Sequence, residues 1–165
     1  MTEAVKNHQA VFVGAAKARL EALFPKYPTK QACLLPALWI VQQERGWISD
    51  GAVAEVAEVL GLTPAYVRGV VTFYTMYHTH PVGRHFIQVC TTSPCNICGA
   101  EEVSKAFLKH TGCLELGATS PDGRFTVMEV ECLGACGFAT PALIDDDFIE
   151  GVTPERVAGI LQGYR

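Results

Sequence analysis

Seven cysteines are the residues best able to do chemistry in this chain of 165 residues. Four of them form two closely spaced pairs, a C-x4-C motif at Cys90 and Cys95 and a C-x3-C motif at Cys132 and Cys136. Each pair follows a short apolar stretch typical of a β-strand, so both motifs are expected in loops at strand ends. If these strands are neighbours in one sheet, four thiolates meet at one edge, which is what a [2Fe-2S] cluster requires. The four cysteines are therefore predicted to bind such a cluster.

Cys98 allows two other schemes. It extends the first motif to C-x4-C-x2-C, the spacing of plant-type ferredoxins, in which a fourth cysteine completes the site. That scheme leaves either Cys132 or Cys136 unused. Alternatively, Cys95 and Cys98 form a C-x-x-C motif just before a predicted helix, as in a thiol–disulfide oxidoreductase. This second scheme explains neither Cys90 nor the C-x3-C motif, so both rank below the cluster.

A zinc-stabilised interaction module on the same four thiolates is a further alternative, although zinc sites usually prefer C-x2-C turns. The two remaining cysteines, Cys33 and Cys113, are predicted to be small core residues, because free cysteine is among the most buried residue types. No histidine pairs with a cysteine at a Rieske-like spacing, and His78 and His80 lack a third ligand nearby. The sequence shows no Gly-rich phosphate loop, Walker motif or GxGxxG fingerprint. No nucleotide site is predicted on this chain.

Composition narrows the class of protein. The chain is 49% hydrophobic, which is enough to bury a core. No apolar run reaches the roughly 20 residues that span a bilayer, and residues 1–8 resemble neither a secretory signal nor a transit peptide. An odd number of cysteines without a secretion signal argues against a disulfide framework. A cytoplasmic protein without membrane insertion is predicted.

The net charge of −4 is concentrated in the second half. Residues 82–165 hold six Lys and Arg against eleven Asp and Glu, a local net charge of −5, whereas residues 1–81 hold seven against six. Nucleic-acid binding needs basic patches, so nucleic acid is not an expected partner.

The elements that must position the cysteines fall into two parts. The first part is predicted to be helical, because its apolar residues recur every three or four positions and so form packing stripes along one face of each helix. Two helices are expected at 11–24 and 33–45. A third is expected to start directly after Asp50 and to end at Gly61, and a fourth to start after an N-cap at Thr63, with Pro64 as its first residue.

The second part alternates strands and helices. It is predicted to contain strands at 85–90 and 125–130, a hairpin at 142–144 and 148–149, and helices at 99–110 and after Thr153. This β-α-β-β-α order is the skeleton of a thioredoxin-like domain. The predicted fold is thus α+β, with an N-terminal helical bundle region at 1–81 and a thioredoxin-like [2Fe-2S] ferredoxin domain at 82–165.

Three sequence strings resemble one protein family. They are FYTMYHTHPVGRHFIQVCTTSPC followed by GAEEV, ECLGACGFATPALIDDDFIEGVTPERV, and the helical LPALWIVQQERGWI. They closely resemble the small [2Fe-2S] subunit of the NADH dehydrogenase module of respiratory complex I. The resemblance covers roughly residues 15–162.

This resemblance implies a function. It implies cluster ligands at Cys90, Cys95, Cys132 and Cys136, and single-electron exchange with FMN in a larger iron–sulfur flavoprotein subunit that binds NADH and FMN. The N-terminal helices would dock on that partner, and the complex would lie at the cytoplasmic face of the inner membrane in a peripheral arm. A low reduction potential is expected, because burial and nearby carboxylates such as Glu131 disfavour added negative charge.

Two points stay open. Related modules occur in NAD-linked hydrogenases and formate dehydrogenases, so an equivalent subunit of either is an alternative. Cys98 departs from the usual family pattern. It is either a spectator near the cluster or a thiol that serves as a reserve ligand or redox sensor.

Overall fold

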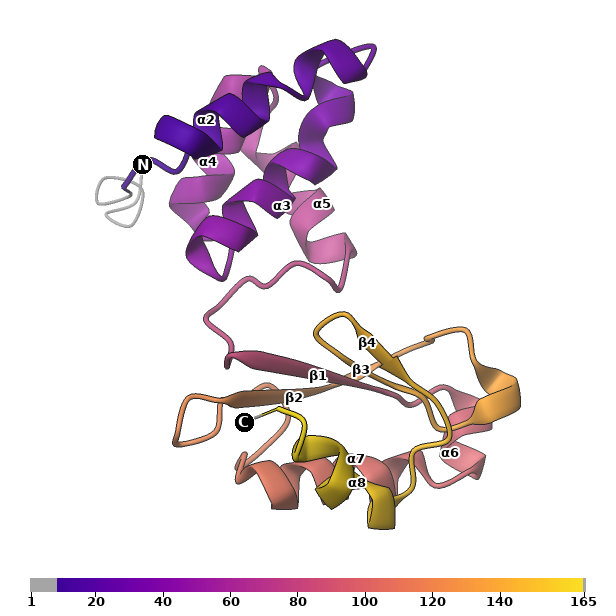
Figure 1. The fold of residues 1–165 in the computed structure, drawn as a ribbon. Helices are drawn as coiled ribbons and strands as arrows, with labels where there is room; N and C mark the ends of the chain where they lie inside the picture. Colours follow the sequence, from indigo (N-terminus) through magenta and orange to yellow (C-terminus); the bar gives the residue numbers. More distant parts are fainter. Residues whose placement is uncertain (1–8, 165) are drawn as a thin grey trace. The chain divides into compact units, whose positions relative to one another are not determined.

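The computed structural model describes residues 9–164, and the chain divides into two compact units, 1–81 and 82–165 (Figure 1). The first unit is helical, and the second contains a four-stranded sheet with helices. A helical region followed by a domain with the element order β-α-α-β-β-β-α confirms the predicted α+β fold class, with one strand and one helix more than the β-α-β-β-α skeleton.

The first unit is built from helices whose ends follow local signals. Gly46 and Gly61 end their helices in the left-handed conformation, and the Thr63 hydroxyl accepts a hydrogen bond from Tyr66 N at the start of the last helix. The helices are α2 (Gly14–Glu21), α3 (Leu34–Arg45), α4 (Asp50–Leu60) and α5 (Pro64–Phe73), with 3-10 turns at Phe24–Lys26 and Gln31–Cys33.

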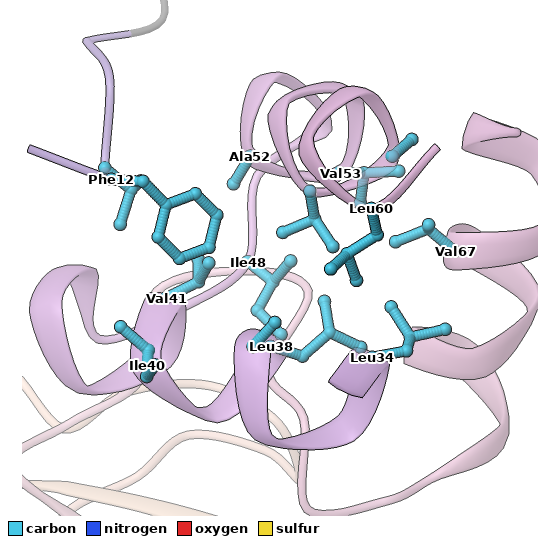
Figure 2. Packing of buried hydrophobic residues seen from close by; sticks show 14 of the residues in the cluster. Phe12, Leu34, Leu38, Ile40, Val41, Ile48, Ala52, Val53, Leu60 and Val67 are labelled. Atoms are coloured by element: carbon cyan, nitrogen blue, oxygen red, sulfur yellow. The ribbon is translucent and has the colours of Figure 1, made fainter. Parts of the chain in front are cut away.

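The core of the first unit lies between these helices. Figure 2 shows Leu34 and Leu38 of α3 directed toward Val53 and Leu60 of α4. Val67 of α5 belongs to the same buried cluster. The packing stripe predicted for α4 is therefore confirmed, because all four of its residues (Val53, Val56, Ala57 and Leu60) are buried. The stripe predicted for α5 is buried at Val67 and Val71, but Tyr74 at its end is exposed.

Two predicted helix starts in this unit were wrong. The helix expected from Val11 begins only at Gly14, because the Glu55 carboxylate accepts hydrogen bonds from Val11 N (2.9 Å) and Phe12 N (2.9 Å). The N-cap of α4 is Ser49, whose hydroxyl accepts from Ala52 N at 3.2 Å; Asp50 is already the first helical residue.

The second unit is organised around a sheet with the order β2-β1-β3-β4. Its strands are β1 (His85–Cys90), β2 (Phe125–Val130), β3 (Ala142–Ile144) and β4 (Asp147–Ile149). Strands β1 and β2 are parallel neighbours, with Cys90 opposite Val130, whereas β3 runs antiparallel to both β1 and β4. The carboxyl ends of β1 and β2 therefore lie at the same edge of the sheet.

Helices α7 (Ala100–Thr111) and α8 (Pro154–Leu161) lie together on one face of this sheet (Figure 1). Phe107 of α7 and Val157 of α8 are fully buried against Ile87, Val127 and Ile144 of the strands. A short helix that the sequence did not predict, α6 (Ser93–Ile97), precedes α7.

Within residues 9–164, no single helix has the length and apolar character to cross a membrane. In this same part of the chain, α4 and α5 reach that length and apolar character only when taken together, and they are bent by 119° where they join.

Candidate functional site

The first cysteine loop connects β1 to α6. Cys90 is the last residue of β1, and Thr92 is the N-cap of α6, whose first turn contains Pro94. This turn carries Cys95 back beside Cys90, so that their Sγ atoms lie 3.3 Å apart. Both side chains are almost fully buried, with 2% and 1% of their surface exposed.

The second cysteine loop follows β2. Cys132 comes two residues after the end of the strand, and Cys136 begins a 3-10 turn. Gly134 between them has a φ of +80°, a conformation that favours glycine and allows the tight turn. Both of these cysteines are exposed, in contrast to the first pair.

Hydrogen bonds join the two loops. Thr91 N donates to Val130 O at 3.0 Å, which continues the parallel pairing of β1 and β2 by one residue. The Thr92 hydroxyl donates to Glu131 O, and Cys90 Sγ lies 3.3 Å from the same carbonyl. The loops are thus held together at the carboxyl edge of the sheet, where the sequence predicted that they meet.

An apolar cluster surrounds the first pair of cysteines. Cys90, Cys95 and Ala100 form its buried part, and Leu133 and Ala139 of the second loop pack against them. The second loop therefore covers the thiols of the first and excludes water from them.

The two buried thiols have different acidities. Burial raises the pKa of Cys90, but hydrogen bonds from the Thr92 hydroxyl and from the backbone N–H groups of Thr92 and Leu133 outweigh it, so the pKa is lowered overall. Burial, followed by the neighbouring Cys90, raises the pKa of the Cys95 thiol to about 12, with smaller contributions from Cys136 and Cys98. Of the two buried thiols, Cys90 therefore carries negative charge more readily than Cys95.

The chemistry of the four predicted ligands suits an iron–sulfur cluster, because all four are soft thiols. Among the side chains of residues 9–164, no three His, Cys, Asp or Glu are grouped so that they could hold one metal ion. Tetrahedral binding at about 2.3 Å places two thiolates on one metal roughly 3.8 Å apart. The Cys90 and Cys95 sulfurs are close to that separation, whereas Cys132 and Cys136 of the second loop do not join them in a ready-made group of three. Backbone N–H groups directed at a ligand sulfur are also typical of iron–sulfur sites.

The other three cysteines lie outside this arrangement. Cys33 and Cys113 are buried in the cores of the two units, which confirms the prediction that they are core residues. Cys98 follows α6 and is exposed. The dithiol alternative is disfavoured, because Cys95 is buried and its raised pKa makes it a poor nucleophile.

Thr92 and Leu133, which connect the loops through side-chain contacts, were not predicted from the sequence. A local signal for a helix start existed near Thr92, since a proline such as Pro94 is common in a first helical turn, but it did not single out Thr92. No local signal marked Leu133, whose contact with Cys90 and Cys95 depends on strand pairing.

Comparison with known proteins places the chain in a family. A family model described as thioredoxin-like [2Fe-2S] ferredoxin matches residues 20–165. A relative from Pseudomonas aeruginosa, named as a subunit of NADH-quinone oxidoreductase, is 40% identical over 160 residues, which cover 97% of this chain and 96% of the relative. NADH-quinone oxidoreductase subunit 2 of Thermus thermophilus is 41% identical over 149 residues, covering 88% and 82% of the two chains.

A solved structure shows the same fold. An NAD+-reducing [NiFe]-hydrogenase in the air-oxidized state superposes with a TM-score of 0.66 at 22% identity, over 80% of this chain and 22% of the hydrogenase chain. At that identity the likeness concerns the fold alone. The family match over most of the chain, together with the relatives that are about 40% identical along most of their length, shows that this chain belongs to the thioredoxin-like [2Fe-2S] ferredoxin family.

Proposed function

We propose that this chain is the electron-transfer subunit of an NADH:quinone oxidoreductase, and that Cys90, Cys95, Cys132 and Cys136 hold its [2Fe-2S] cluster. The observation that carries the proposal is the meeting of two cysteine loops at the carboxyl edge of β1 and β2. The similarity to relatives named as subunits of NADH-quinone oxidoreductase supports it.

The residues around the thiols have separable roles. The cluster supplies a one-electron redox site and makes or breaks no substrate bond. Cys90 and Cys95 are preorganised by burial and by their proximity, whereas Cys132 and Cys136 are brought by the second loop. Leu133 and Ala139 exclude water from the buried side of the site. The N–H groups of Thr92 and Leu133 stabilise negative charge on the Cys90 sulfur.

The electron donor belongs, in this proposal, to a partner. We propose a larger iron–sulfur flavoprotein subunit that binds NADH and FMN, with the helical unit at 1–81 docked on it and the cluster exchanging single electrons with the flavin. The proposed location is the peripheral arm of the complex at the cytoplasmic face of the inner membrane. The support is that the relatives are named as subunits of a larger oxidoreductase.

The ligand assignment is tested by paired substitutions. Wild-type protein is expected to contain about two irons and two sulfides and to give the EPR signal of a reduced [2Fe-2S] cluster. Cys132→Ser should lose most of the iron, and Cys98→Ser, which changes another exposed cysteine outside the proposed set, should keep it. The reverse result would favour the plant-type scheme, and a colourless protein with one bound zinc would refute the cluster.

The parent complex is tested by isolating it. An affinity tag on this chain is expected to co-purify an FMN-containing subunit and an NADH:quinone oxidoreductase activity that follows the amount of tagged chain. Hydrogen or formate oxidation in place of quinone reduction would transfer the subunit to a hydrogenase or a formate dehydrogenase. A cluster reduced far above the potential of the NADH couple would contradict electron exchange at this point.

A further inference from the structure

The Thr92 side chain lies between the two cysteine loops. Its Oγ1 is 3.2 Å from Cys90 Sγ and also donates a hydrogen bond to the carbonyl of Glu131. Cys90 Sγ lies 3.3 Å from that same carbonyl oxygen. Sulfur, hydroxyl and carbonyl thus form a triangle in which each atom is within contact distance of the other two.

The number of protons in this triangle depends on the state of Cys90. A carbonyl oxygen only accepts, and a hydroxyl has one proton to donate. A protonated Cys90 thiol brings a second proton and donates it to Glu131 O, as the geometry allows. A thiolate that binds iron has no proton. Cys90 Sγ and Glu131 O are then two acceptors in contact. Cys95 Sγ, which donates to Cys90 Sγ as a thiol, would also have lost its proton as a ligand. Among residues 9–164, the Thr92 hydroxyl then holds the only side-chain proton that reaches either acceptor.

We infer that Thr92 is a positioning residue for the cluster, whose hydroxyl donates its hydrogen bond to the Cys90 sulfur when that sulfur is an iron ligand. This inference rests on the proposed function. The hydroxyl rotates from the carbonyl to the sulfur, so no covalent bond forms or breaks. Because hydrogen bonds to an ionised acceptor are stronger than neutral ones, the thiolate is the preferred acceptor.

A redox consequence follows from the sign of the charge. Reduction adds an electron to a cluster and increases the negative charge that its ligand sulfurs share. A donor at Cys90 Sγ therefore stabilises the reduced state more than the oxidised state. The Thr92 hydroxyl raises the reduction potential, in opposition to the burial that lowers it.

The neighbouring Thr91 provides a matched control. Its hydroxyl donates to Val130 O at 3.4 Å, so it also joins the two strands at the same edge. That bond does not involve a cysteine sulfur. Substitution of Thr91 therefore reports the effect of weakening the connection between the loops without removing a hydrogen-bond donor from a proposed ligand sulfur.

The experiment compares Thr92→Val, Thr92→Ser and Thr91→Val by EPR-monitored redox titration, with iron and sulfide measured for each. Thr92→Val is expected to lower the equilibrium constant for reduction about tenfold, which is about 59 mV for one electron. Thr92→Ser and Thr91→Val should leave the potential near the wild-type value. In the reduced wild-type cluster, an exchangeable proton coupling seen by ENDOR in H2O should disappear in Thr92→Val and persist in the other two.

The outcomes separate this inference from the proposed function. Wild-type protein without iron and sulfide refutes the proposed function, whatever Thr92 does. With a wild-type cluster present, an unchanged potential in Thr92→Val, or an equal shift in Thr91→Val, overturns the inference. If Thr92→Val does not retain a cluster, the rates at which Thr92→Ser and Thr92→Ala lose iron to a chelator are compared instead. Faster loss from Thr92→Ala alone supports the role of the hydroxyl, and equal loss from both overturns it.

Discussion

Individual cysteines differ in how ready they are to react. Cys90 and Cys95 are buried and adjacent, whereas Cys132 and Cys136 are exposed on the second loop. Burial limits access of any reagent to a thiol, and ligation removes the thiolate that would react. The reactivity of the thiols therefore distinguishes spectators from ligands.

Alkylation with iodoacetamide tests this distinction. After iron has been removed by chelation under reducing conditions, mass spectrometry should find fast labelling at the exposed thiols of Cys98, Cys132 and Cys136 only. With the cluster present, Cys98 alone should remain reactive, because ligation protects the other two. Fast labelling of Cys132 in the iron-loaded protein would contradict its assignment as a ligand.

Asp122 supplies a pH-dependent interaction in the turn before β2. The Ser120 hydroxyl, then the Arg124 N–H and the Arg124 guanidinium, hold the pKa of Asp122 at about 2, below its ordinary value of 3.8. Since the folded-state pKa is the lower one, the stabilisation by the carboxylate is fully present above about pH 3.8 and is lost as pH falls through about 2.

Asp122→Asn should remove this dependence. The difference in free energy of unfolding between wild type and variant is expected to be constant above about pH 4 and to shrink as the pH approaches 2. An NMR titration of the Asp122 carboxyl carbon gives the midpoint directly. A midpoint near 3.8 would show that the hydrogen bonds of the turn are absent in solution.

Among the elements, the pairing of β1 with β2 matters most to the site, and Gly83 lies two residues before its first pair, His85 and Phe125. A Cβ built on Gly83 would lie 2.6 Å from the backbone carbonyl carbon of Phe125, closer than real contacts allow. Gly83 N also donates to the buried Thr126 hydroxyl at 2.8 Å, which in turn contacts the Thr119 hydroxyl. This close approach sets the register that places Cys90 opposite Val130.

Gly83→Ala should therefore destabilise the second unit by about 1–3 kcal/mol, the usual range for overpacking. Gly159→Ala in α8 is the matched control, because a Cβ there meets nothing within 4 Å. Replacing a helical glycine in open space by alanine should raise the free energy of unfolding by about 0.4–1 kcal/mol. Urea denaturation measures both effects, and equal stabilities for the two variants would contradict the close approach.

At the scale of the whole molecule, each unit has its own buried core. The segment that connects the units, residues 79–82, is attached by hydrogen bonds on either side. The buried Gln42 side chain donates to Met76 O at 2.8 Å and accepts from His78 N at 2.7 Å. Gly83 N is bound to Thr126 in the second unit. The stretch at 79–82 lies between these two points of attachment.

Limited digestion with a broad-specificity protease should thus cut first within residues 79–82. Mass spectrometry is expected to find two fragments that end and begin in this stretch, and the visible absorbance of the cluster should remain with the C-terminal fragment. A first cut inside either cysteine loop would show that the site is less ordered than the connection between the units.

Local patterns predicted many element boundaries. Strands β1 and β2 lie at the residues expected from alternation, and Gly46 and Gly61 end their helices as glycine signals indicated. The predictions were wrong where a distant group competes with the local signal. The Glu55 carboxylate, over forty residues along the chain, binds the N–H groups of Val11 and Phe12 and so delays the start of α2.

For the site, the sequence by itself determined the chemistry of the donors, because soft thiolates in two short-spaced pairs suit few metals. It also determined that each pair follows a strand. Only the tertiary structure decided that Thr92 and Leu133 complete the surroundings of Cys90, and that the first pair is buried while the second is exposed. The physical reason is sequence distance. Thr92 and Glu131 are 39 residues apart, and only the parallel register of β1 and β2 brings that hydroxyl and that carbonyl to the same sulfur.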